Sequence, residues 1–204
     1  MNLQSLESEL KKRLDFPYTW GRKQSDEWDR KTKFIYQTQD FESLETQCKD
    51  FDNELRNYAF NRWLNFWSAK AIEQIFTNYP NVRKEENQFS KTVDFYISEI
   101  PFDHKSSVFP KQFGQSLDYA IEHKKELIEW LYQNQSQQGR KHLENRLFII
   151  FFDEKNGEHW KMKTELTLIQ EKIEDYLGNF SKDNLVSLNL EFDKIFSDII
   201  WIKK

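Results

Sequence analysis

Residues 92–105 constrain the fold more than any other stretch, because they have the pattern of two short strands joined by a tight Ser-Glu turn. Folding them as a hairpin pairs Ile97 with Ile100, and the same register sets Asp94 opposite Asp103. Side chains alternate between the two faces of a strand. One face of the hairpin is therefore predicted to carry Val93, Phe95, Ile97, Ile100, Phe102 and His104, and the other face Asp94, Asp103 and Lys105.

Two carboxylates in this position need an explanation, because directly opposed cross-strand residues have Cβ atoms roughly 5 Å apart and like charges there destabilise the pair. A divalent metal ion bound between Asp94 and Asp103 would turn this repulsion into ligation. In a simpler alternative, Asp103 and Lys105 form an exposed ion pair on one face and Asp94 only ends a strand. The hairpin pattern alone leaves both interpretations open.

The spacing of these charged residues resembles the metal-site signature of a known superfamily. Asp94 followed by Asp103, His104 and Lys105 is similar to the Asp…(Asp/Glu)-x-Lys signature of the PD-(D/E)XK nucleases. Val93 stands where the signature has proline, a departure that is common among divergent members. The resemblance implies a restriction-endonuclease-like core, which is an α/β fold of the α+β type with a mixed sheet flanked by helices.

Two further features extend the resemblance over residues 60–153. Gln115 and Tyr119 are similar to the Gln-x-x-x-Tyr motif of the RecB-like branch, and a helix would place them on one side. Tyr119 alternatively packs beneath the N-terminal segment. Glu73 lies in the helix predicted before the hairpin, where family members often supply a glutamate to the site, although an ordinary solvated glutamate explains it equally well.

The resemblance assigns a role to each of these residues. A lysine among carboxylates should stay protonated, so Lys105 is expected to act electrostatically rather than as a general base. Gln115 would contact the substrate or the attacking water, and Tyr119 the substrate backbone. The implied ligands of Mg²⁺ or Mn²⁺ are Glu73, Asp94, Asp103 and the carbonyl of His104, and the implied catalytic residues are Glu73, Asp94, Asp103, Lys105, Gln115 and Tyr119.

Apolar periodicity predicts the remaining elements within one domain, with residues 1–58 as a helical N-terminal extension and residues 59–204 as the nuclease-like core. The order of helix, three strands, helix and strand in that core matches the superfamily independently of the motif. Residues 146–152 are expected to form a buried strand parallel to the second hairpin strand. Helices are predicted at residues 1–14, 41–79 with one break, 115–134 and 164–177. Strands are predicted at residues 82–86, 146–152, 185–192 and 195–202, with a possible strand at 34–36. A connection is expected at residues 106–113 and a polar loop at 133–140.

Composition narrows the function less than the motif does. The formal net charge of −4 gives no overall basic field for nucleic acid, and the local basic clusters are typical of solvated helix faces. The histidines lack zinc-ligand spacing. Cys48 is the single cysteine, and no apolar run approaches the ~20 residues of a spanning helix, so we expect a cytoplasmic protein without a membrane partner.

Two classes of function remain. The first is a metal-dependent nuclease that acts on DNA in defence, repair or mobile-element biology. The second is a catalytically inactive nuclease-fold module that binds nucleic acid or a protein partner. The negative net charge favours the second slightly, or else a partner that brings the nucleic acid. A homodimer is compatible with either class.

Overall fold

The computed structural model describes residues 1–20, 26–87, 90, 92–134, 144–190 and 193–204. The chain forms two compact units, of which the first comprises residues 1–72 with 163–169 and the second residues 73–162 with 170–204. Residues 53–72 of the long helix α4 (Asn53–Thr77) belong to the first unit, and residues 73–77 belong to the second. That the chain is one domain with an extension ending at residue 58 stays a prediction.

The first unit is helical among its described residues. Asn2 begins helix α1 because its side chain accepts a hydrogen bond from the backbone N–H of Ser5 (3.0 Å). Asp40 caps helix α3 in the same way through Ser43 (2.8 Å). The break predicted within residues 41–79 is confirmed, since α3 and α4 are separate helices. The helices are α1 (Leu3–Lys12), α2 (Asp26–Lys31), α3 (Phe41–Gln47) and most of α4.

The prediction of a possible strand at residues 34–36 is wrong, because Lys33–Tyr36 form a 3₁₀-helix. Its backbone hydrogen bonds are local, with the N–H of Ile35 donating to the carbonyl of Thr32 and that of Gln37 to Phe34. Three apolar residues in a row satisfy a strand pattern and a helical turn equally well. The described residues of this unit include no strand with which they could pair, so the local hydrogen bonds prevail.

Aromatic side chains form the core of the first unit. The ring of Phe41 lies 5.1 Å from that of Phe60 and 5.5 Å from that of Trp63, measured between centroids, and all three are buried. The indole N–H of Trp63 donates to the carbonyl of Thr38 (2.7 Å), so this large side chain is buried without losing its hydrogen bond. The rings fix α4 against α3 and the segment that precedes it.

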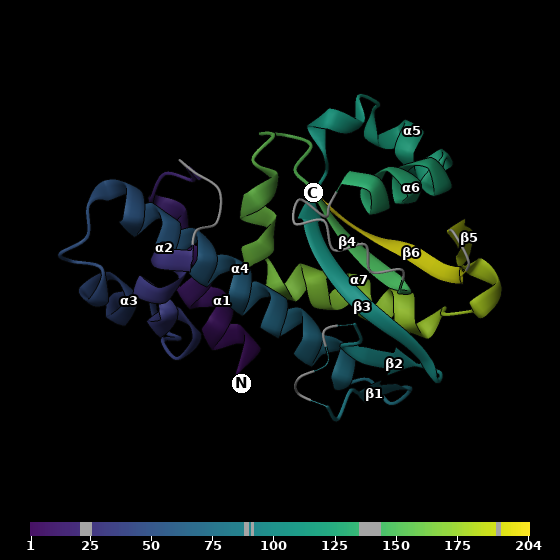
Figure 1. Ribbon diagram of the computed structural model, residues 1–204, viewed down its shortest axis with the longest axis horizontal. Helices are drawn as coiled ribbons and strands as arrows, with labels where there is room; N and C mark the ends of the chain where they lie inside the picture. Colours follow the sequence, from purple (N-terminus) through teal and green to yellow (C-terminus); the bar gives the residue numbers. More distant parts are fainter. Residues whose placement is uncertain (21–25, 88–89, 91, 135–143, 191–192) are drawn as a thin grey trace. The chain divides into compact units, whose positions relative to one another are not determined.

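The second unit is a mixed α/β structure built on a six-stranded sheet with the order β1-β2-β3-β4-β6-β5. The parallel pairing of β3 with β4 is confirmed, β4 is also parallel to β6, and the remaining pairs are antiparallel. Figure 1 shows the strands side by side, with β3 and β4 near the middle of the sheet. The strands are β1 (Val82–Lys84), β2 (Phe95–Ile97), β3 (Ile100–Val108), β4 (Arg146–Phe152), β5 (Val186–Leu190) and β6 (Asp193–Lys203).

The β2–β3 hairpin has the register predicted from the sequence. Ile97 pairs with Ile100 beside the turn, and Phe95 pairs with Phe102 farther along. The two turn residues, at positions 98 and 99, both have positive φ angles, 47° and 67°, although neither is a glycine. Two-residue hairpin turns of this kind usually place glycine, asparagine or aspartate there, so the ladder rather than the turn fixes this register.

Helices cover both faces of the sheet. On one face, α6 (Lys124–Asn134) packs Leu127 and Leu131 into a buried cluster with Phe148 of β4. On the other face, Phe76 at the end of α4 stacks on Phe95, with the ring centroids 4.4 Å apart. The face of β3 that carries Lys105 is the face covered by α6, because Lys105 pairs in register with Phe148.

The single helix predicted for residues 115–134 is two helices in the structure. Gly114 adopts a left-handed conformation (φ 75°), and the side chain of Ser116 then caps α5 (Leu117–Glu122) by accepting a backbone N–H. The helical path breaks at His123, and α6 follows. The apolar period continues through this break, which is why periodicity alone predicted a single helix.

The connection predicted at residues 106–113 begins later than expected, because β3 continues to Val108. The pairing of β3 with β4 extends as far as Phe151, so the polar part of β3 is held as a strand by its neighbour rather than by its own propensity. The helix predicted at residues 164–177 is α7 (Leu166–Gly178). Most of the predicted loop at residues 133–140 lies outside the described residues.

A buried lysine in the first unit gives a testable dependence of stability on pH. Burial lowers the pKa of Lys163 to about 8, and its Nζ donates to the Oδ1 of Asn65 (2.6 Å). Between about pH 8 and the unfolded value near 10.4 the unfolded chain binds more protons than the folded one, so the free energy of unfolding should rise with pH by roughly 3 kcal/mol. Lys163→Met should remove this rise, as measured by urea unfolding across the window. Equal slopes in both proteins would contradict the assignment.

Candidate functional site

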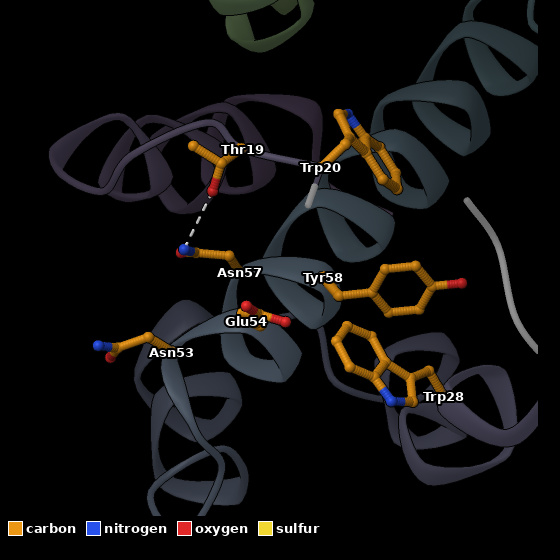
Figure 2. Close-up of a pocket in the computed structure, with 7 residues that line it drawn as sticks. All are labelled: Thr19, Trp20, Trp28, Asn53, Glu54, Asn57 and Tyr58. Atoms are coloured by element: carbon orange, nitrogen blue, oxygen red, sulfur yellow. Dashed lines mark hydrogen bonds between the residues drawn. The ribbon is translucent and has the colours of Figure 1, made fainter. Parts of the chain in front are cut away.

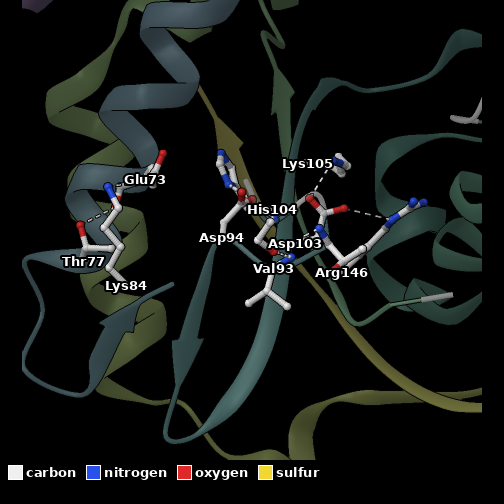
Figure 3. Close-up of polar contacts among 11 residues, drawn as sticks. Glu73, Thr77, Lys84, Val93, Asp94, Asp103, His104, Lys105 and Arg146 are labelled. Atoms are coloured by element: carbon white, nitrogen blue, oxygen red, sulfur yellow. Dashed lines mark hydrogen bonds and ion pairs between the residues drawn. The ribbon is translucent and has the colours of Figure 1, made fainter. Parts of the chain in front are cut away.

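Asp94 lies just before β2, where the hairpin ladder ends. Its backbone N–H donates to the carbonyl of Phe102 (2.9 Å), so Asp94 is not set opposite Asp103 as the simple register predicts. Its carboxylate Oδ2 instead accepts the backbone N–H of His104 (2.9 Å) and lies 2.7 Å from the ring Nδ1 of the same residue (Figure 3). The Asp94 side chain thus takes the place of the backbone acceptor that a longer β2 would offer to β3.

The surroundings of Asp94 favour its charged form. Burial by itself would raise the pKa of this carboxyl, but the hydrogen bonds and charge of His104 outweigh it, and Lys105 adds a smaller contribution. The pKa of Asp94 is therefore lowered. The carboxylate stabilises the fold above its unfolded pKa, and this stabilisation is lost as the pH falls through the lowered folded value.

Asp103 lies in β3 in a drier setting with different partners. Lys105 donates its Nζ to the Oδ1 of Asp103 (2.7 Å), and the Nε of Arg146 lies 3.5 Å from the Oδ2. Arg146 pairs in register with Asp103 across the parallel β3–β4 ladder. Burial raises the pKa of Asp103 despite these two cations, and the negative charge of Asp94 raises it further.

The two carboxylates approach β3 from different directions. Asp103 and Lys105 project from one face, as predicted, whereas Asp94 turns toward His104, whose ring stacks beside Phe95 on the other face. Figure 3 shows the Asp94–His104 contact and the Asp103–Lys105–Arg146 contacts on either side of the strand. Asp103 and Lys105 therefore share one face of β3 as predicted, and the carboxylate of Asp94 lies at the β2 edge of the strand, where its charge still raises the pKa of Asp103.

The backbone of His104 adds an oxygen between these two groups. Along a strand, the N–H and C=O of one residue point toward the same edge. Because the N–H of His104 meets Asp94 at the β2 edge, its carbonyl points to that edge as well. Asp94, Asp103 and this carbonyl offer oxygen atoms of the kind Mg²⁺ prefers, and Mg²⁺ is commonly held by only one or two carboxylates.

Glu73 does not join these oxygen ligands as predicted. It lies in the last turns of α4, and its carboxylate pairs with the Nζ of Lys84 in β1 (3.0 Å), as Figure 3 shows. Among the described residues, no group of three or more His, Cys, Asp or Glu side chains gathers in a way that could hold a metal ion. The ligand set that remains is Asp94, Asp103 and the carbonyl of His104.

Gln115 and Tyr119 are placed differently from the motif prediction. Gln115 precedes the cap of α5 and is exposed, so the two residues do not share one helical face. The ring of Tyr119 stacks on His123, with the centroids 4.0 Å apart, and its hydroxyl donates to Glu126 (2.9 Å). These contacts hold Tyr119 to its own helix pair, on the α5–α6 side of the sheet.

Arg146 is the site residue that the sequence analysis missed. It was interpreted only as the charge that bounds the buried strand of residues 146–152. Its guanidinium lies over the ring of Tyr132, 4.9 Å from the centroid, and its buried Nε has no hydrogen-bond partner among the described residues. The available signal was its place at the start of a strand predicted to run beside Asp103.

We compared the sequence with models of known families and with curated proteins, and the structure with solved structures. None of the three comparisons gave a match. Within the described ranges, no helix is both long enough and apolar enough to cross a membrane. The function is therefore inferred from the chemistry and geometry of the residues themselves.

The contact between Asp94 and His104 can be tested through stability. Asp94→Ala removes the acceptor of a part-buried backbone N–H and of a ring nitrogen, so the free energy of unfolding should fall by about 1–3 kcal/mol at pH 7. The loss should shrink at acidic pH, because the Asp94 carboxyl of the wild type is then protonated and no longer offers a charged acceptor to His104. Glu86→Ala removes an exposed carboxylate from the same unit and serves as the control in urea unfolding. A loss no larger than that of the control would contradict the structural role of Asp94.

Proposed function

We propose that this chain is a metal-dependent nuclease of the PD-(D/E)XK type, with a restriction-endonuclease-like core, that hydrolyses phosphodiester bonds of DNA. The observation that carries the proposal is the position of three charged residues on the sheet. Asp94 directly precedes the first strand of the hairpin, and Asp103 and Lys105 lie on the second, which runs beside the parallel strand β4. The order of α4, three strands, the α5–α6 pair and β4 supports the same core.

The residues that would hold Mg²⁺ or Mn²⁺ in this proposal are Asp94, Asp103 and the carbonyl of His104. A divalent ion bound there would neutralise charge on the phosphate and activate a water molecule for attack. Asp103 must exchange its present hydrogen bond with Lys105 to bind a metal. That exchange is feasible because the Lys105 side chain is 43% exposed and free to turn toward a phosphate.

The remaining roles in the proposed reaction belong to other side chains of the protein. Lys105 would stabilise negative charge that develops on the reacting phosphate, and the charge of Arg146, whose Nε lies 3.5 Å from the Oδ2 of Asp103, would favour the ionised carboxylate. Gln115 and Tyr119 lie with α5 on the face of the sheet from which Lys105 projects, so we assign them to contact with the substrate. Glu73 pairs with Lys84 and is left out of the proposed ligand set.

A second candidate is a nuclease-fold module without activity that binds nucleic acid or a protein partner. The observation that favours it is that both carboxylates already have partners within the chain, Asp94 with His104 and Asp103 with Lys105 and Arg146. The formal net charge of −4 adds a general repulsion toward nucleic acid. Metal binding and cleavage distinguish the two candidates.

The first test is the effect of metal on stability. A ligand that binds only the folded state adds RT ln(1 + [L]/Kd), about 2.7 kcal/mol at a hundredfold excess over Kd. Mg²⁺ or Mn²⁺ should therefore raise the melting temperature of the wild type and leave Asp103→Asn nearly unchanged in differential scanning fluorimetry. Glu129→Gln, a change at an exposed carboxylate on α6, should respond as the wild type does. Equal shifts in wild type and Asp103→Asn would place the metal elsewhere.

The second test separates an enzyme from a binding module through Lys105. An interaction made mainly in the transition state affects turnover more than binding, and losing one such electrostatic contact costs about a hundredfold or more in rate. Lys105→Ala should therefore abolish most cleavage of a labelled DNA duplex in Mg²⁺ or Mn²⁺, while affinity for the duplex falls much less.

The matched control is Lys125→Ala, which removes an exposed lysine of α6 and should leave cleavage unchanged. A binding module would show no cleavage in any of the proteins, and Lys105→Ala would only weaken binding and flatten its salt dependence by about one unit of slope. Cleavage by Lys105→Ala at the wild-type rate would exclude the proposed mechanism.

A further inference from the structure

In the helical first unit, the short segment from Arg30 to Tyr36 combines basic residues with an exposed aromatic ring. Tyr36 is 44% exposed and ends the 3₁₀-helix Lys33–Tyr36. Residues three apart in a 3₁₀-helix lie on the same side, about 6 Å apart along the axis, so Lys33 and Tyr36 face the same way. The sequence alone indicates a solvated helix face here, and the structure adds an open ring within it.

The ring of Tyr36 is held in place by residues of α4. Phe66 meets it edge-on, with the centroids 4.7 Å apart and an interplanar angle of 69°. The Nη2 of Arg62 donates to the hydroxyl of Tyr36 (2.6 Å), and the guanidinium lies 5.4 Å from the ring centroid. An aromatic ring that is fixed in orientation and still exposed offers a preformed surface to a ligand.

The segment that carries these residues is itself anchored on α4. The ring of Trp28 in α2 lies 5.2 Å from that of Tyr58, and Figure 2 shows the two rings beside each other. The indole N–H of Trp67 donates to the carbonyl of Ile35 (3.0 Å). Because α2 and the 3₁₀-helix are both fixed in this way, a ligand that binds there has little protein conformational entropy to overcome.

Arg30 and Lys33 supply positive charge to this surface. Both side chains are exposed, and neither forms an ion pair with a described residue. Two carboxylates close to them in the chain already have basic partners, in the pairs Glu27–Lys31 (2.8 Å) and Asp29–Arg62 (3.4 Å). In a chain with a formal net charge of −4, a local positive surface of this kind is what the binding of a polyanion requires.

We infer that this surface, formed by Arg30, Lys33, Tyr36 and Phe66, binds a single strand of nucleic acid. A base would stack on the ring of Tyr36, and the two cations would contact neighbouring phosphates. A base inside a duplex has no free face for the ring, and an acidic peptide would leave the ring unused, so an unpaired strand fits best. A nuclease and a module that only binds nucleic acid would both use such a surface, which lies outside the proposed nuclease site.

The test measures binding of a fluorescein-labelled single-stranded DNA of about 12 nucleotides by fluorescence anisotropy, with EDTA present to prevent cleavage. The whole chain should bind this strand, and Tyr36→Ala should bind it about tenfold more weakly, because the stacking of one base is lost. Tyr36→Phe keeps the ring and is the matched control, so it should bind nearly as the wild type does. Tyr36 is exposed, so both variants should fold.

A second variant tests the charge of the surface. Lys33→Gln should weaken binding and flatten the plot of log K against log [salt] by about 0.7, the value for one phosphate contact on a single strand. Lys155→Gln, at an exposed lysine of the second unit, should leave the affinity and the slope unchanged. Unlabelled single strand should compete with the labelled strand, whereas duplex DNA and polyglutamate should compete poorly.

Tyr36→Ala that binds as tightly as the wild type would overturn the inference. Competition by duplex DNA or polyglutamate equal to that by the single strand would overturn it as well, and so would the absence of binding by the folded wild type. None of these results involves cleavage, so the proposed nuclease activity stands or falls separately, in the assay of Lys105→Ala.

Discussion

β3 has nine residues and its hairpin partner β2 has three, and this inequality determines where the charged groups of the sheet lie. Beyond Phe102, the edge of β3 that faces β2 has no paired strand residue in the described part of the chain, so its backbone groups take other partners. The side chain of Asp94 supplies one by accepting the N–H of His104. An aspartate at this point serves the backbone, and its charge also raises the pKa of Asp103. The candidate site is thus a result of how the sheet ends.

The two aspartates occupy environments that shift their proton affinities in opposite directions. Hydrogen bonds from His104 lower the pKa of Asp94, whereas burial raises the pKa of Asp103. Neighbouring carboxyls that are separated in this way are a frequent feature of sites that bind cations or move protons. The ion pairs with Lys105 and Arg146 partly offset the cost of burying Asp103.

The sequence was sufficient to predict the features that depend on a local residue pattern. It was not sufficient to predict the features that depend on contacts between distant parts of the chain. Alternation predicted the register of Ile97 with Ile100, because a slip by one residue would expose an apolar face, and the continuous apolar run of residues 146–152 predicted the parallel strand. The apolar periodicity did not predict the break at His123, because the same spacing of apolar residues continues from the first helix into the second. The partners of Glu73 and Arg146 depend on residues distant in sequence, so no local pattern could have predicted them.

The turn at Ser98 and Glu99 has a consequence for how the sheet assembles. Both residues hold left-handed conformations that glycine and asparagine adopt more readily, so this turn has little tendency to form in the isolated segment. A hairpin with a weak turn and a three-residue ladder cannot nucleate folding by itself. We expect the strands to come together only after β4 and the helices have begun to cover them, so the segment that carries the aspartates is among the last parts of the sheet to become ordered.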